Sequence, residues 1–523
     1  MDEHEDEILL TGGTIITIDP KRPRAEALLV RGNRIVAVGS AAEVEAAARA
    51  GARRVALEGK TVVPGFNDAH IHLANLGMRE NQVNLEGLDK RAIIDRLLAA
   101  ARELKRGEPL LAFAWDYESC PDPQRRDLDE HFPDRPVVLI QFSGHGAWLN
   151  SAALRMLSID ERTEPWEMGR PEVDTSGALT GIIGEPGNYP PMRTFWFSRM
   201  KDRRAIRAGL AAAMKRMAEH GITSVQDNSW WPRTVREIAR LHRRGEQTCR
   251  ISCWSLGREP LTDVRFSISR FKPDWYERGP RKFFWDGAFS SRTAWLTEPY
   301  ADRSETVGSG ATAEEIEPRL RAAIRQRRQV AAHSIGDAAT AAYCEAFDRL
   351  DPPSGLRFRI EHGQLIREED FERIRRLGMV VSAQPHAAGD PEKDRRLLGE
   401  ERAARAYPFR RLLDLGIPLA FGSDYPGEAT YDPLYGIQLA VDRPEGPAIT
   451  AEEAIACYTA GGAYAEWKES TKGRLRPGFL ADLAVLSADP TVVPPGAIGE
   501  IDVILTMVDG RIVHDRAADG VIE

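Results

Sequence analysis

The chain has 523 residues and a formal net charge of -8, from 79 acidic and 71 basic side chains. No segment gathers Lys and Arg with interleaved aromatic residues, no apolar run is long enough to span a membrane, and the acidic start "MDEHEDE" has the wrong charge for a secretory signal. Five scattered cysteines without any C-x-x-C spacing fit a reducing compartment.

These features define the expected setting. We expect a cytoplasmic protein that acts on a small molecule, with no nucleic-acid partner, no membrane partner and a surface compatible with a homodimer. A chain of this length exceeds one ordinary compact core, so a large barrel with an appended domain, or two to three domains, is expected.

Both ends of the chain have the texture of β-sheet. The first sixty residues carry β-branched runs broken by Gly12-Gly13 and by a turn at Gly32-Asn33, and the last fifty contain a hairpin turn at Asp509-Gly510. Two half-sheets bury their apolar faces most readily against each other. Residues 1–62 and 470–523 are therefore predicted to form one small β-sandwich domain.

Between them, residues 63–469 alternate strand-like and amphipathic helical segments, which is typical of a parallel α/β sheet. Eight strands close a barrel, and eight strand ends are found, at "DAHIH", "GITSVQD", "RISCWSL", "KFFWDG", "VAAHSIG", "RFRIEH", "VVSAQP" and "PLAFGSD". The prediction is a (β/α)8 TIM-like barrel. Two further strand-like runs are assigned to an insertion after barrel strand 1, at about residues 108–200, which is rich in Trp, Pro and Gly and serves as a lid.

The strand ends carry the residues of a metal site. His70 and His72, at i and i+2 of one strand, point to the same face and can grip one ion together. The later strands add His333, His362 and Asp424. Catalytic groups of such barrels lie at the carboxyl ends of the strands, so the set predicts zinc or a similar divalent ion, with Asp424 both as ligand and as general base and acid.

Lys282 stands in the same series of strand ends. A protonated ammonium beside a dication would be repelled, so Lys282 must be neutral, modified or turned away. A carbamate formed with carbon dioxide would be anionic and could bridge two metals. An unmodified Lys282 predicts one metal. Glu185 and Cys253 are candidates for a substitute bridging ligand, with a loop turn for Glu185 and a core position for Cys253 as the alternative interpretations.

Three further residues are candidates for substrate contact. Trp115 could form part of an aromatic wall, although Trp is as often ordinary core. His145 lies in the insertion and could touch substrate or be structural. Arg292 could bind an anionic group through two hydrogen bonds, or form a surface salt bridge.

Several motifs give the chain a family resemblance. "GHGAWLNSAAL" (144–154), "KFFWDGAFSSRTAWL", "HSIGDAA", "RIEHGQ", "GSDYP" and "GRLRPGFLADLAVL" resemble the amidohydrolase superfamily, and within it amidohydrolase family 3, the branch that includes N-substituted formamide deformylases. The resemblance spans nearly the whole chain. It implies a barrel with a flanking β-sandwich, hydrolysis of C–N bonds other than peptide bonds, and a carboxylated Lys282 between two metals.

The predicted reaction is hydrolysis of a small amide, an N-substituted formamide or a cyclic amide by metal-activated hydroxide. The chain departs from the family at "DGAFSSRTA", "HSIGD" and Gly363, which bears on substrate preference. Two alternatives stay open: the same metal barrel acting on a lactone or as a decarboxylase, and a catalytically idle metal-binding regulatory protein.

Overall fold

The structure is a computed structural model that describes residues 7–79, 83–142, 144–166, 169–199, 202–229, 232–256, 270–428, 430–443 and 446–516. The outermost residues of the predicted terminal domain, 1–6 and 517–523, lie outside this set. Among the described residues, no helix combines the length and the apolar character needed to cross a bilayer.

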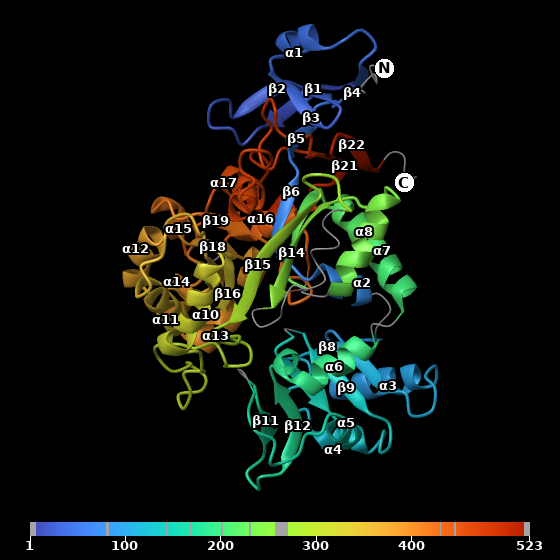
Figure 1. The fold of residues 1–523 in the computed structure, drawn as a ribbon, viewed down its shortest axis with the longest axis vertical. Coiled ribbons are helices and arrows are strands. Elements are labelled where there is room, and N and C mark those ends of the chain that lie inside the picture. Colours follow the sequence, from blue (N-terminus) through green and yellow to red (C-terminus); the bar gives the residue numbers. More distant parts are fainter. Residues whose placement is uncertain are drawn as a thin grey trace.

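Eight parallel strands form the centre of the molecule (Figure 1). In sheet order they are β6 (Phe66–Ile71), β13 (Ile222–Asp227), β14 (Arg250–Leu256), β15 (Tyr276–Phe284), β16 (Val330–Ser334), β17 (Arg359–His362), β18 (Val380–Ala383) and β19 (Leu419–Phe421). Strands β6 and β19 contact each other. Just past β19, the Asp424 N–H donates to the His70 carbonyl at 2.6 Å and the His72 N–H donates to the Tyr425 carbonyl at 2.9 Å. The predicted barrel is confirmed as a nearly closed one.

Helices cover the outside of the barrel, because strands buried on both faces need a second apolar layer. Every residue of β16 is buried, for example. The covering helices include α7 (Arg203–Glu219), α8 (Pro232–Arg243), α10 (Ala313–Arg325), α11 (Asp337–Asp348), α12 (Glu368–Arg376), α15 (Phe409–Asp414), α16 (Pro433–Val441), α17 (Ala451–Ala456) and α18 (Gly462–Ala465). Shorter helices follow individual strands: α2 (Leu73–Arg79), α13 (Pro391–Leu398) and α14 (Glu400–Arg405).

Strands from both ends of the chain form one sheet, which we call the terminal sheet. Its order is β22 (Arg511–Asp515), β21 (Val503–Val508), β20 (Leu483–Leu486), β5 (Thr61–Pro64), β1 (Glu7–Ile16), β2 (Arg24–Arg31) and β3 (Arg34–Gly39), with β4 (Arg53–Ala56) paired to β1 and α1 (Ala41–Ala47) beside it. The antiparallel pair of β20 and β5 joins the two ends. The described strands make a single connected sheet, and the sandwich stays a prediction.

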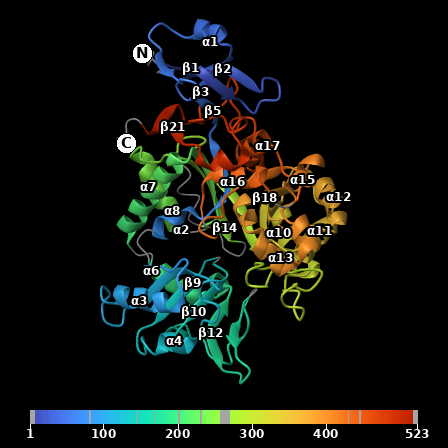
Figure 2. The same ribbon diagram turned by 180° about the vertical axis from the view of Figure 1, so that it is seen from behind.

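Between β6 and β13 lies the insertion, a six-stranded sheet at the opposite end of the molecule from the terminal sheet (Figure 2). Its strands, in order, are β11 (Pro171–Val173), β12 (Leu179–Gly184), β10 (Gly146–Leu149), β9 (Val137–Gln141), β8 (Leu110–Trp115) and β7 (Val83–Asn84). Two apolar cores lie against this sheet, one with α3 (Lys90–Ala101) and α4 (Arg125–Asp129), the other with α5 (Ser151–Met156) and α6 (Pro190–Arg199).

The extent of the insertion differs from the sequence-based expectation. Strand β7 pairs with β8, and Ile93 and Leu97 of α3 belong to the core of the insertion. We therefore place its start near residue 83 instead of about 108. This boundary is hard to predict from the sequence, because β7 is only two residues long and α3 has the amphipathic pattern of a barrel helix.

Candidate metal centre

Both ring nitrogens of His70 have polar partners. Its Nδ1 donates to Glu361 Oε2 at 2.6 Å, and both side chains are fully buried. This bond leaves the lone pair on Nε2, which accepts from Asn228 Nδ2 at 2.9 Å. A carboxylate that fixes the far nitrogen of a histidine is the usual support of a metal-binding imidazole.

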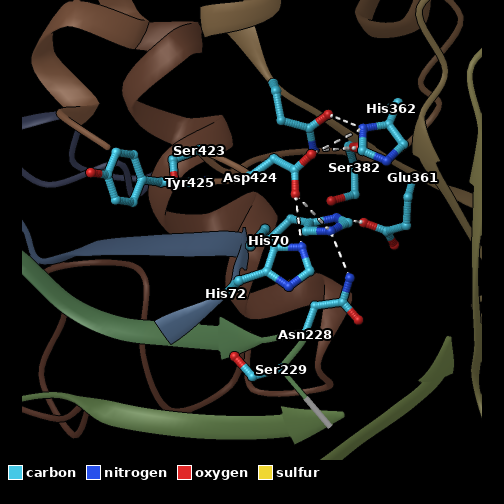
Figure 3. A network of polar contacts seen from close by, with 12 residues as sticks. His70, His72, Asn228, Ser229, Glu361, His362, Ser382, Ser423, Asp424 and Tyr425 are labelled. Carbon is cyan, nitrogen blue, oxygen red and sulfur yellow. Dashed lines mark hydrogen bonds and ion pairs between the residues drawn. The ribbon is translucent and has the colours of Figure 1, made fainter. Parts of the chain in front are cut away.

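Asp424 lies beside His70 and His72 where the barrel closes (Figure 3). Its Oδ1 lies 3.3 Å from His70 Nε2 and 3.2 Å from His72 Nε2, and its Oδ2 lies 3.9 Å from His362 Nδ1. Burial tends to raise the pKa of the Asp424 carboxyl, but the surrounding imidazoles hold that pKa well below its usual range. Asp424 is therefore an anionic group beside several imidazole nitrogens.

Asp68 keeps the two edges of the barrel in register at this point. Its Oδ1 accepts from the backbone N–H groups of His70 at 3.1 Å and Ser423 at 3.0 Å, and its Oδ2 accepts from the Ser423 hydroxyl at 2.6 Å. Burial is the main reason that the pKa of Asp68 is raised to about 7. This carboxyl ties β6 to the segment that carries Asp424.

His362 reaches the same centre through an unusual backbone conformation. Neighbouring side chains on a strand point to opposite faces, yet both Glu361 and His362 contact residues of the centre. His362 has φ +75° and Gly363 has φ +54°, so the chain turns out of the strand at this point. His362 Nδ1 donates to Gln384 Oε1 at 2.7 Å, and its buried Nε2 has no hydrogen-bond partner among the described residues.

These groups fit a cation. One ligand atom each from His70, His362 and Asp424 lies within 4.8 Å of the other two. Burial lowers the pKa of His70, and it lowers the pKa of His362 to about 3. Neutral imidazoles beside a carboxylate are a donor set that divalent ions such as zinc accept.

His333 and Lys282 lie beside the centre but outside the group formed by His70, His362 and Asp424. The His333 ring packs edge-on against His362, with ring centroids 4.4 Å apart, and its Nε2 donates to the Gly287 carbonyl at 2.9 Å. Lys282 is buried, with Nζ 5.0 Å from the Phe284 ring centroid. Burial lowers the pKa of Lys282 to about 8, against the opposing effect of Glu361 and Asp424.

The three candidates for substrate contact have different surroundings. His145 lies beside the centre: its ring centroid is 4.9 Å from that of His333, and its Nδ1 donates to Glu185 Oε1 at 2.7 Å. Trp115 is instead fully buried in the core of the insertion, where its indole N–H donates to the Leu139 carbonyl at 3.0 Å. Its packing is that of a core residue, which was its alternative interpretation.

Arg292 forms the salt bridge that was its alternative interpretation. One terminal nitrogen lies 2.5 Å from Asp302 Oδ2, and the other donates to the Ser290 carbonyl at 2.7 Å. Both terminal nitrogens are thus engaged within the protein, whereas the buried Nε has no hydrogen-bond partner among the described residues. Of the substitute bridging ligands, Glu185 pairs with His145, and Cys253 is a buried thiol whose pKa is raised well above its usual value by burial.

Several residues that organise the centre were not predicted from the sequence. They are Asp68, Asn228, Arg359, Glu361 and Gln384. Glu361 directly precedes His362 in "RIEHGQ", and the alternation of strand side chains argued against placing both at one site. The signal available in the sequence was Gly363, because a glycine there allows the chain to turn out of the strand.

Comparison with known proteins agrees with this geometry. A family model described as "Amidohydrolase family" matches residues 53–514. YtcJ of Bacillus subtilis is 30% identical, covering 97% of this chain and 99% of that protein. The N-substituted formamide deformylase of Arthrobacter pascens is 29% identical, covering 98% of each chain.

Among solved structures, an uncharacterized metal-dependent hydrolase from Pyrococcus furiosus superposes with a TM-score of 0.72 at 28% identity, covering 93% of this chain and 100% of that one. The chain therefore belongs to the amidohydrolase family, and it is a hydrolase that acts on carbon–nitrogen bonds other than peptide bonds.

Proposed function

We propose that this enzyme hydrolyses a small amide, such as an N-substituted formamide or a cyclic amide, at a centre that holds one or two divalent ions, with zinc as the first choice. The observation that carries the proposal is the meeting of two imidazole nitrogens and one carboxylate oxygen within 4.8 Å at the point of barrel closure. The similarity to a protein named N-substituted formamide deformylase supports the choice of substrate class.

The proposed ligands are His70, His72, His333, His362 and Asp424, with Lys282 as a carbamate bridge. A carbamate forms from a neutral amine, and the burial that lowers the pKa of Lys282 to about 8 increases the neutral fraction near physiological pH. A divalent ion bound there would lower the pKa of a water molecule and polarise the carbonyl of the substrate.

Asp424 is the proposed proton carrier. Its side chain is 19% exposed, whereas the His70 side chain is fully buried, so the carboxylate is the more accessible of the two groups. The imidazoles around it keep it ionised, and therefore ready to take a proton from the attacking water. The same carboxyl would then give that proton to the leaving nitrogen, because an amine leaves poorly unless it is protonated.

His145 is the proposed substrate contact from the insertion. It reaches the centre from the loop between β9 and β10, and the Glu185 carboxylate fixes its ring. Glu185 also donates its backbone N–H to the His145 carbonyl at 2.8 Å. This two-way contact lies within the insertion, and the imidazole ring it holds packs against His333 and Phe284 of the barrel.

The test is a substrate panel of N-substituted formamides, N-acyl amines, cyclic amides and lactones, assayed with zinc-loaded protein. We expect release of amine from at least one amide class, and loss of that activity in Asp424→Asn. The matched control is Asp489→Asn, whose carboxylate pairs with Arg24 beside the terminal sheet. Turnover confined to lactones, or amide turnover that Asp424→Asn leaves intact, would contradict the proposal.

A further inference from the structure

Arg359 is joined to the candidate metal centre through a single carboxylate. It begins β17 and is fully buried. Its Nε donates to Glu361 Oε1 at 2.7 Å, and a terminal nitrogen donates to Glu361 Oε2 at 3.2 Å. The same Oε2 accepts from His70 Nδ1 at 2.6 Å. One carboxylate therefore links the guanidinium to the imidazole.

The guanidinium also holds the backbone that carries His70. The nitrogen that contacts Glu361 Oε2 donates to the Ala69 carbonyl at 2.8 Å and to the Ser382 hydroxyl at 2.9 Å. The other terminal nitrogen donates to Gln226 Oε1. These partners lie on β6, β18 and β13, so Arg359 connects four barrel strands. It fixes both the peptide that precedes His70 and the group that orients the His70 ring.

The aromatic ring of Trp254 completes the arrangement. The Arg359 guanidinium lies 4.7 Å from the centroid of this ring, and the His70 ring centroid lies 5.0 Å from it. A planar, forked cation can stack on an aromatic face while it donates several hydrogen bonds in its own plane. The ammonium of a lysine cannot reproduce this combination.

The positive charge of Arg359 compensates the buried negative charge of Glu361. A fully buried carboxylate is costly unless it is paired and hydrogen-bonded. Arg359 supplies that partner through two hydrogen bonds to the Glu361 carboxylate. The Glu361 carboxylate accepts at both oxygens, from Arg359 and from His70, so His70 carries its proton on Nδ1.

We propose that Arg359 is a positioning residue for the metal centre: acting through Glu361, it holds the His70 ring in the tautomer and orientation that present the Nε2 lone pair toward Asp424. This inference rests on the proposed metal site. It predicts that Arg359, which is linked to His70 through Glu361, sets the affinity of the centre for zinc.

The test is zinc affinity, measured by chelator competition at fixed pH on wild type and two variants. Glu361→Gln keeps the shape of the side chain but cannot accept at both oxygens, and Arg359→Lys keeps the charge but loses the fork. We expect each variant to bind zinc about 10–100-fold more weakly than wild type, the usual effect of removing the support of a metal-binding histidine.

The matched control is Arg250→Lys. Arg250 is also a buried arginine at the start of a barrel strand, with a forked contact to Asp482 at 2.6 and 2.9 Å, but it ties the barrel to the terminal sheet. We expect Arg250→Lys to lower the melting temperature and to keep wild-type zinc affinity. If Arg359→Lys and Glu361→Gln bind zinc as tightly as Arg250→Lys does, the inference is overturned. Absence of zinc binding by wild type would contradict the proposed function itself, and this inference with it.

Discussion

The replacement Asp424→Asn separates proton transfer from substrate binding. The amide has the shape of the carboxyl group and keeps one oxygen that can face His70 Nε2 and His72 Nε2, now at 3.3 and 3.2 Å from Asp424 Oδ1. It cannot take up and return a proton. General acid–base catalysis contributes about 10²–10⁴-fold to a rate, which corresponds to about 2.7–5.4 kcal/mol of transition-state stabilisation.

We therefore expect kcat to fall by at least about 10²-fold while KM changes much less, because the lost interaction belongs to the transition state. The assay is steady-state amide hydrolysis, with the metal content of each sample measured by elemental analysis. This second measurement matters because Asp424 is also a proposed ligand. Near-full turnover in a metal-loaded Asp424→Asn sample would show that Asp424 does not carry the proton.

Three other predictions address the wider structure. Trp115→Ala should destabilise the insertion by about 3–5 kcal/mol in denaturant unfolding, because it empties a fully buried site; a raised KM with unchanged stability would favour substrate contact instead. Because the folded-state pKa of Asp68 is raised from 3.8 to about 7, its proton contributes stability that is complete below pH 3.8 and lost as the pH rises through about 7. The melting temperature of the metal-free protein should show this loss, and the contribution should disappear in Asp68→Asn. Metal loading with bicarbonate should increase from pH 6 to pH 9 as Lys282 becomes neutral, and Lys282→Met should abolish the increase; equal loading of both proteins at every pH would exclude the carbamate.

The barrel could be predicted because its signal is local and repeated. Each of the eight strands combines an apolar run with a polar residue at or near its carboxyl end, and β6 to β19 appear in that order in the structure. The insertion was harder to delimit. Its first strand, β7, has two residues, too few for any periodicity, and only its pairing with β8 shows where it belongs.

The residues of the metal centre likewise include some that the sequence predicts and some that only the structure reveals. His70 and His72 could be found from the i, i+2 spacing, because that spacing already fixes which face they share. Glu361 could not, because its approach to His70 depends on a chain reversal at His362, φ +75°, that strand alternation does not predict. The pairing of Arg359 with Glu361 follows from the same alternation, but its connection to the Ala69 carbonyl requires the closed barrel.

The most direct test of the account is a crystal structure of the zinc-loaded protein with anomalous scattering recorded at the zinc edge. We predict an anomalous peak among the side chains of His70, His362 and Asp424, within ligand distance of at least one imidazole nitrogen and of the carboxylate. A peak elsewhere in the molecule, or zinc-loaded crystals with no peak at this position, would contradict it.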